Sequence, residues 1–200
     1  MKRKIGKTDN SQTAAQPPSE TTELQALANP LRMRAYVLLR VEGGKTTGDI
    51  AETVGCAVGS MSYHLHQLEA AQLVKRVAAP DGDGRKSWWV AREGGERPEL
   101  AASTDRAGHE AIEAFRSARG VVYGEMYRRY LAQCDTMEKA WREGEVAADA
   151  FMRLTPDELK QLSSEMDELL SRWDKVASGH VEGDGSEQVA LVFQGFKWVP

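Results

Sequence analysis

The sequence predicts a mainly helical α+β protein, with a compact N-terminal domain and a helical C-terminal unit that ends in a short strand pair. Three observations lead to this prediction. Two short helical patterns flank a tight turn, two strand-like runs follow them, and helical spacing dominates the second half of the 200 residues. The expected parts are a disordered tail over 1–20, a domain over 21–92, a linker over 93–103 and a C-terminal unit over 104–200.

The N-terminal tail is polar and contains prolines, so it has almost nothing to bury and is expected to be disordered. A short helix is expected to begin near Thr22. Asn29 followed by Pro30 predicts the start of a second helix, because asparagine caps helices well and proline suits the first helical position. Gly43 and Gly44 are expected to end that helix.

A third helix is expected to begin after Thr46. Thr46 has the side chain of an N-cap, and Asp49 lies three residues on, which is the spacing of a capping box. Gly55 is expected to end the helix, because glycine adopts the left-handed conformation at the least cost. The buried stripe of this helix is predicted to be Ile50, Ala51 and Val54.

A fourth helix is expected from Val58 to Ala71. Its inward residues are predicted to be Met61, Leu65 and Leu68, which are spaced by four and three. Its opposite face is small or hydrogen-bonding and has no acidic residue before Glu69; it comprises Gly59, Ser60, Tyr63, His66, Gln67 and Ala70. Such a face suits a helix that enters the major groove of DNA, because base edges offer donors and acceptors and phosphates repel carboxylates.

Two strands are expected over Leu73–Ala78 and Ser87–Ala91. The segment between them, Ala79–Gly84, is rich in turn residues and predicts a hairpin tip. Arg85 and Lys86 follow this tip, where basic side chains can reach phosphates or the minor groove.

Four runs in this order, LANPLRMRAYVLLR, TTGDIAETVG, SMSYHLHQLEAAQLV and GRKSWWV, resemble the ArsR-type winged helix-turn-helix family of bacterial transcription regulators. The resemblance covers roughly Leu24 to Ala91. It implies a winged helix-turn-helix domain in which the helix expected from Val58 to Ala71 binds DNA. Two residues depart from the family pattern: Ala57 stands where a serine or similar cap is usual, and Gln72 where a glycine precedes Leu-Val.

The resemblance also implies which residues contact DNA and which partners are expected. The residues implied to contact base edges or phosphates are Val58, Gly59, Ser60, Ser62, Tyr63 and His66, with Arg85 and Lys86 on the wing. His64, on the flank of the same helix, is expected to pack and to bond the neighbouring helix. The expected partners are double-stranded DNA with a pseudo-palindromic operator and a second copy of the chain, with a possible small-molecule effector. Repression by promoter blocking is the family's usual mode.

The second half is expected to begin with a helical stretch from Thr104 to Glu143. Thr155, Pro156 and Glu158 predict a further helix start, and the stripe from Leu159 to Val176 follows a three-four spacing that fits packing against another helix. The last segment, Gln188–Val199, alternates and is predicted to be a strand, with Val146–Leu154 as its antiparallel partner. The stripe and the glycine-spaced long helix motivate the hypothesis of a homodimer.

Charge is unevenly distributed along the chain. Residues 1–22 carry net charge +2, residues 23–92 carry +2 and residues 93–200 carry −8, so the first two parts suit phosphate and the third repels it. Two distant cysteines, Cys56 and Cys134, indicate no disulfide framework and favour a reducing cytoplasm. We expect no membrane partner and no secretory signal, since no apolar run approaches the length of a membrane helix and MKRK precedes a polar segment.

Two alternatives remain open at this stage. One is a metal- or small-ligand-responsive regulator, whose best metal cluster is His109 with Glu110 and Glu113. A ligand pocket in the C-terminal unit would be lined by Trp141, Phe151, Trp173, Phe193, Phe196 and Trp198. Another is a winged-helix module for protein contacts without DNA binding. No phosphate loop or nucleophile pattern follows a strand, so neither an enzyme nor a bound cofactor is expected.

Overall fold

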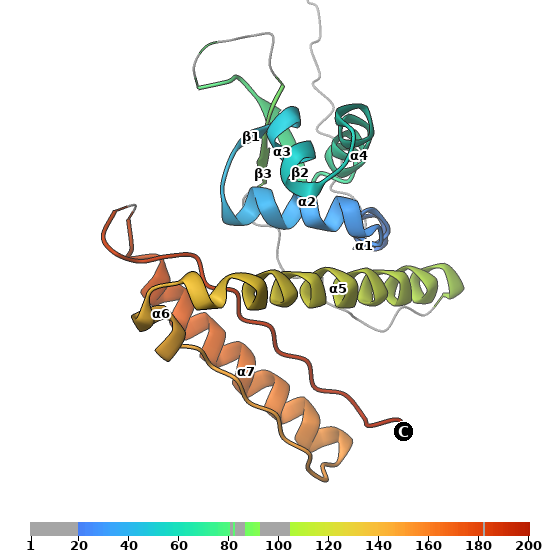
Figure 1. The fold of residues 1–200 in the computed structure, drawn as a ribbon. Helices are drawn as coiled ribbons and strands as arrows, with labels where there is room; N and C mark the ends of the chain where they lie inside the picture. The colour runs from blue at the N-terminus through green and yellow to red at the C-terminus, as the bar shows by residue number, and fades with distance from the viewer. Residues whose placement is uncertain (1–19, 81, 83–86, 93–104, 182) are drawn as a thin grey trace, which may run out of the picture. The chain divides into compact units, whose positions relative to one another are not determined.

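The computed structural model describes residues 20–80, 82, 87–92, 105–181 and 183–200 (Figure 1). The chain divides into two compact units, Met1–Glu125 and Met126–Pro200. The predicted linker, 93–103, and most of the predicted tail lie outside the described residues. No helix among the described residues has both the length and the apolar character that a membrane span requires.

The first unit contains the predicted helical core and a small sheet. Its first four helices are α1 (Glu20–Leu27), α2 (Pro30–Val41), α3 (Thr47–Val54) and α4 (Val58–Ala70). Its strands are β1 (Lys45–Thr46), β2 (Val74–Val77) and β3 (Trp88–Ala91), in the antiparallel order β1-β3-β2. The predicted hairpin is confirmed as the β2–β3 pair, in which Val77 pairs with Trp88 and Val74 with Ala91. Strand β1 was not predicted, because its two residues are too few to show alternation.

The predicted starts of α2 and α3 are formed as expected. Asn29 Oδ1 accepts hydrogen bonds from the backbone N–H groups of Leu31 and Arg32 at 3.0 and 3.2 Å. Thr46 and Asp49 form both bonds of the capping box, each 3.2 Å long. Helix α3 ends at Gly55, which has φ +77°. The turn between α3 and α4 is therefore determined by local sequence at both of its ends.

Helix α4 begins and ends at the two residues that depart from the family pattern. Ala57 precedes it and provides no side-chain cap. At its other end, Leu73 N–H donates to Leu68 C=O and Gln72 N–H donates to Glu69 C=O, both at 2.9 Å. These two bonds form a Schellman motif, which requires a left-handed residue, and Gln72 supplies it with φ +57°. The helix end is sharp although a glycine is missing.

The core of the first unit is formed by its helices and its sheet. Its largest fully buried side chains are Trp89, Leu39, Ile50, Met61, Leu65, Leu68, Val74 and Val122. Helix α5 (Arg106–Gln133) contributes one buried face to this unit, formed by Gly108, Ala111, Ile112, Phe115, Ala118 and Val122. Arg34 of α2 and Glu125 of α5 are joined by an ion pair of 3.4 Å. The start of α5 is thus part of the same core as the predicted DNA-reading helices.

The second unit is built from the end of α5, a 3₁₀ turn at Cys134–Thr136, α6 (Lys139–Glu143) and α7 (Pro156–Ala177). The prediction of one helical stretch to Glu143 was wrong at Cys134–Glu138. Thr136 Oγ1 donates to Gln133 C=O at 2.7 Å and Met137 is extended with ψ 156°, so the backbone leaves the helix there. The start of α7 is confirmed, with a capping box between Thr155 and Glu158.

The expected terminal strand pair is not formed. Neither Val146–Leu154 nor Gln188–Val199 is a strand, and no described backbone–backbone hydrogen bond involves either segment. The segments meet through side chains instead, since Phe151 and Trp198 lie edge to face with ring centroids 6.2 Å apart. The alternating pattern predicted a strand, but a strand also needs a backbone ladder, which this chain does not provide.

Candidate nucleic-acid interface

The outward face of α4 carries the residues that the sequence assigned to DNA. Its exposed members are Val58, Gly59, Ser60, Tyr63 and His66, whereas Ser62 is half-buried. The inward residues Met61, Leu65 and Leu68 are fully buried. The predicted division of α4 into two faces is therefore present, and its buried side fixes the rotation of the outward side.

His66 is exposed but held in one orientation. Its Nδ1 atom lies 2.7 Å from the backbone oxygen of Ser62, and because a carbonyl only accepts, Nδ1 carries the proton in this contact. Its ring meets Trp89 edge to face, with centroids 5.5 Å apart and planes at 75°. In the neutral ring, Nε2 is then a hydrogen-bond acceptor. Such an acceptor complements the amino groups that adenine and cytosine present in the major groove.

Trp89 links this helix to the rest of the domain. It is a β3 residue, only 1% exposed, and its Nε1–H donates to Thr47 Oγ1 at 3.0 Å. Thr47 is the first residue of α3. One indole thus connects the sheet, the start of α3 and the His66 ring of α4.

Tyr63 is the most exposed aromatic side chain of α4, at 59%. Its ring lies edge to face with His64, with centroids 5.5 Å apart. A phenol hydroxyl both donates and accepts hydrogen bonds, and its ring offers apolar area to a base. Tyr63 therefore has the exposure and the chemistry of a base-reading residue.

His64 packs inward, as expected, but its predicted hydrogen bond to the neighbouring helix is not seen at Nδ1. The side chain is 8% exposed, and Nδ1 has no hydrogen-bond partner. Burial and the positive charge of Arg32 both lower the pKa of His64. The guanidinium of Arg32 is itself engaged, donating to the backbone oxygens of Ala26 and Gln25. His64 therefore belongs to the domain interior and not to the reading face.

The charge of this region suits phosphate, but little of it lies on α4. That helix has no acidic residue before Glu69 and no lysine or arginine. Lys75 and Arg76, both exposed on β2, are the basic side chains that sequence reasoning overlooked. The feature of the sequence that could have identified them is a pair of adjacent basic residues immediately after the buried start of a strand. The predicted contacts Arg85 and Lys86 lie outside the described residues.

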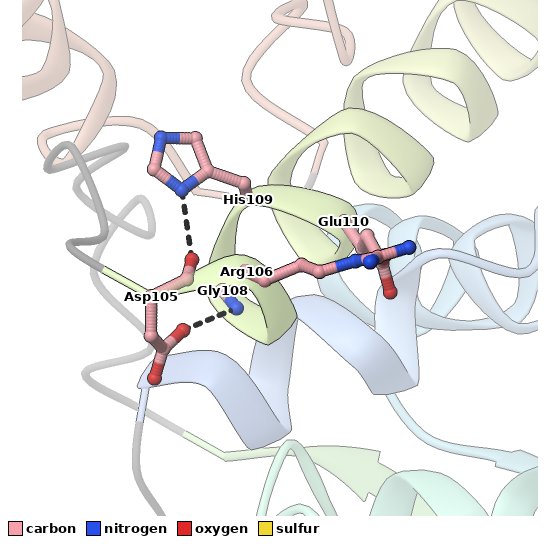
Figure 2. Close-up of polar contacts among 5 residues, drawn as sticks. All are labelled: Asp105, Arg106, Gly108, His109 and Glu110. Carbon is pink, nitrogen blue, oxygen red and sulfur yellow. Dashed lines mark hydrogen bonds and ion pairs between the residues drawn. The ribbon is translucent and has the colours of Figure 1, made fainter.

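The histidine and acid cluster weighed as a metal site lies at the start of α5. His109 Nδ1 donates to the backbone oxygen of Asp105 at 2.7 Å, and Arg106 pairs with Glu110 at 2.7 Å (Figure 2). Asp105 Oδ1 accepts from the backbone N–H of Gly108. Across the described residues, no three histidine, cysteine, aspartate or glutamate side chains gather into a metal-binding group. These contacts are those of a helix N-terminus.

The comparison with protein families matches residues 27–77 to a helix-turn-helix domain. This segment runs from the end of α1 to the end of β2, so it contains the complete helix-turn-helix and the first strand of the hairpin. The match covers about a quarter of the chain. The same comparison does not distinguish the ArsR type. No curated protein matches the chain.

Solved structures with partial similarity include three bacterial proteins. A mutant of ZitR from Lactococcus lactis in the apo form is 15% identical, with 74% of this chain and 83% of that chain covered and a TM-score of 0.31. YusO from Bacillus subtilis is 15% identical, with 76% and 84% covered and a TM-score of 0.33. A mutant of MepR from S. aureus bound to an oligodeoxyribonucleotide is 19% identical, with 77% and 86% covered and a TM-score of 0.30.

These scores and identities are too low to extend the likeness to the whole chain. The assignment of the domain rests on the family match together with the geometry of α3, α4 and the β2–β3 hairpin. Residues 27–77 form the helix-turn-helix domain of a winged helix-turn-helix unit, the type of domain found in DNA-binding regulators.

Proposed function

We propose that this protein is a sequence-specific DNA-binding transcriptional regulator that acts as a homodimeric repressor. Helix α4 enters the major groove, and the wing contacts the flanking backbone or minor groove through Arg85 and Lys86. The observation that carries the proposal is the outward face of α4, which presents Ser60, Tyr63 and an oriented His66 and has no carboxylate before Glu69.

The start of α4 supports a phosphate contact. Ala57 offers no side-chain acceptor, so the N–H groups of the first turn remain available to donate to another partner. Gly59 and Ser60 are exposed at this end of the helix. An exposed helix N-terminus favours a phosphate, both through these donors and through the helix dipole. The departure from the family pattern at Ala57 thus has a functional explanation.

The homodimer belongs to this proposal because α4 alone has little positive charge. Lys75 and Arg76 add two exposed bases in each copy, and the wing would add Arg85 and Lys86. Two copies double the number of phosphate contacts and place two reading helices on one duplex. A two-fold axis would then set the half-sites about 34 Å apart, one turn of DNA, on a pseudo-palindrome. The ArsR-type assignment rests on the order of the four sequence runs.

The test is selection of DNA fragments from a random pool by the purified full-length protein, followed by sequencing. The proposal expects an enriched site of two related halves spaced by one helical turn, with affinity that falls steeply as salt rises. Tyr63→Ala should change the selected bases. Tyr127→Ala is the matched control, since Tyr127 is 53% exposed against 59% for Tyr63 and lies on α5.

If the wild-type protein shows no salt-dependent DNA binding, the proposal is rejected. The remaining hypothesis is then a winged-helix module for protein contacts. Regulation by a metal or small ligand is a separate alternative within the same class. It predicts that an added metal or compound releases the protein from the selected site, with the mass of the protein unchanged.

A further inference from the structure

The second unit leaves its apolar residues uncovered. None of the described residues after Glu125 is buried. Helix α7, orange in Figure 1, carries the most regular apolar face of this unit. Its stripe alternates spacings of three and four and comprises Leu159, Leu162, Met166, Leu169, Trp173 and Val176. A stripe with this spacing is the seam by which one helix packs on another.

One end of the stripe is covered by the chain itself, and the other end is open. At the start of α7, Leu159 is half-buried, and a Cβ added to Gly195 would lie 3.4 Å from its Cδ1 atom. At the other end, Trp173 is 57% and Val176 51% exposed. The tail of the unit therefore covers only part of the seam, and the open part needs another partner.

The two rows that flank the stripe differ in charge. Glu158, Glu165 and Arg172 recur at intervals of seven residues, so they form one row beside the apolar side chains. The row on the other side of the stripe consists of Ser163, Leu170 and Ala177, which are uncharged. Among the described residues Arg172 makes no ion pair, and Glu165 accepts only a hydrogen bond from Gln161 at 2.9 Å.

This charge pattern is complementary to itself in one orientation. In an antiparallel pair of α7 helices, Leu162 of one copy lies opposite Trp173 of the other. The charged rows then face each other, and Glu165 meets Arg172 of the second copy twice, once on each side of the two-fold axis. In a parallel pair, each charged row faces the uncharged row, and no ion pair forms.

We propose that α7 is a dimerisation helix that pairs antiparallel with α7 of a second copy of this chain. The helix has 22 residues and is roughly 33 Å long, enough for a contact approaching the ~800 Å² per partner of a standard interface. This inference names the surface that forms the homodimer of the proposed function. Its tests use no DNA, so it can fail while DNA binding stands, and the reverse is also possible.

The first experiment measures the mass of the full-length protein by sedimentation equilibrium across the micromolar range. Wild type should be a dimer. Glu165→Arg and Arg172→Glu should each weaken association about tenfold, because two attractive contacts become repulsive. The double variant restores opposite charges, so its association constant should return to within about twofold of the wild-type value. Glu168→Arg is the matched control, because it makes the same charge change outside the row of Glu158, Glu165 and Arg172.

Trp173→Asp tests the apolar part of the seam. The side chain is 57% exposed in the single chain, so its loss should leave the helix content measured by circular dichroism unchanged. The variant should be monomeric at concentrations where wild type is dimeric. A monomeric wild type, a dimeric Trp173→Asp variant, or a double charge variant no better than the single ones would overturn the proposal.

The second experiment reads the orientation by disulfide formation in a Cys56→Ser and Cys134→Ser background. In the antiparallel pair, a mixture of Leu162→Cys and Trp173→Cys chains should form the cross-linked dimer. Leu162→Cys alone should not, because its two copies are separated by roughly 16 Å along the helix axis, far beyond the reach of a disulfide. Cross-linking of Leu162→Cys with itself would show a parallel pair and overturn the proposal.

Discussion

The imidazole of His66 lies edge-on to the indole of Trp89, with ring centroids 5.5 Å apart. Because Trp89 also donates its N–H to Thr47, the ring that packs against His66 is held by a contact at the start of the preceding helix. Residues 42 positions apart are joined by this one hydrogen bond. The side chains behind α4 therefore set its reading face as much as the helix does.

Thr47→Val removes the acceptor of the Trp89 N–H and keeps the shape of the side chain. The partly buried indole donor is left without its partner, so the free energy of unfolding should fall by about 1–3 kcal/mol. Urea unfolding monitored by tryptophan fluorescence measures the change. Thr53→Val is the control, since Thr53 is exposed and donates only to the Asp49 carbonyl within its own helix. Equal losses in the two variants would contradict the assigned role of Thr47.

Gln72→Gly should stabilise the domain by about 0.5–1 kcal/mol, because a residue with φ +57° is held in a conformation that costs glycine almost nothing. The variant loses an exposed hydrogen bond from Arg92 to Gln72, which offsets little of the gain. Thermal unfolding measures the change. Gln67→Gly, in the helical part of α4, should instead destabilise the domain by about 1 kcal/mol. The two glycine substitutions should therefore change the free energy of unfolding in opposite directions.

Ala57→Ser should raise the free energy of unfolding by about 1 kcal/mol, because the hydroxyl would cap the uncapped start of α4. The same hydroxyl would occupy an N–H group that the proposed phosphate contact uses. Affinity for DNA should therefore fall on all sequences although the protein becomes more stable. Ala70→Ser at the other end of α4 controls for the added hydroxyl. A variant that is more stable and binds DNA equally well would remove the phosphate contact from the proposal.

His64 should make the domain sensitive to acid. Burial, followed by the nearby Arg32 charge, lowers the pKa of His64 below its usual value of 6.5. The unfolded chain therefore binds a proton that the folded chain does not, so this contribution to stability is present above about pH 6.5 and is lost as pH falls. His64→Leu should flatten the dependence of Tm on pH between about 5 and 7. An unchanged slope in His64→Leu would contradict this role of His64.

Arg85→Ala should weaken DNA binding on all sequences and reduce the slope of log affinity against log salt by about one, because a phosphate contact carries no sequence information. Fluorescence anisotropy with the selected site and an unrelated duplex measures both quantities. A loss confined to the selected site would instead indicate that Arg85 reads bases, and the wing would then enter a groove.

Local signals in the sequence were sufficient for the first unit. The caps at Asn29 and Thr46, the glycine at the end of α3 and the apolar stripes act over a few residues, so their structural consequences were correctly predicted. The second unit was predicted less well. Alternation over Gln188–Val199 suggested a strand, but pairing depends on residues distant in sequence or on another chain, which a local pattern does not reveal.

The sequence by itself determined where the helices of the reading domain begin and end, which face of α4 is buried and where the hairpin lies. Capping and periodicity are local properties, and this explains their predictability. Only the tertiary structure decided that Trp89 packs against His66, that His64 Nδ1 has no hydrogen-bond partner, and that Gln72 adopts the left-handed conformation at the end of α4. The first two results depend on packing between segments distant in the chain, and the third depends on the two backbone hydrogen bonds that close α4.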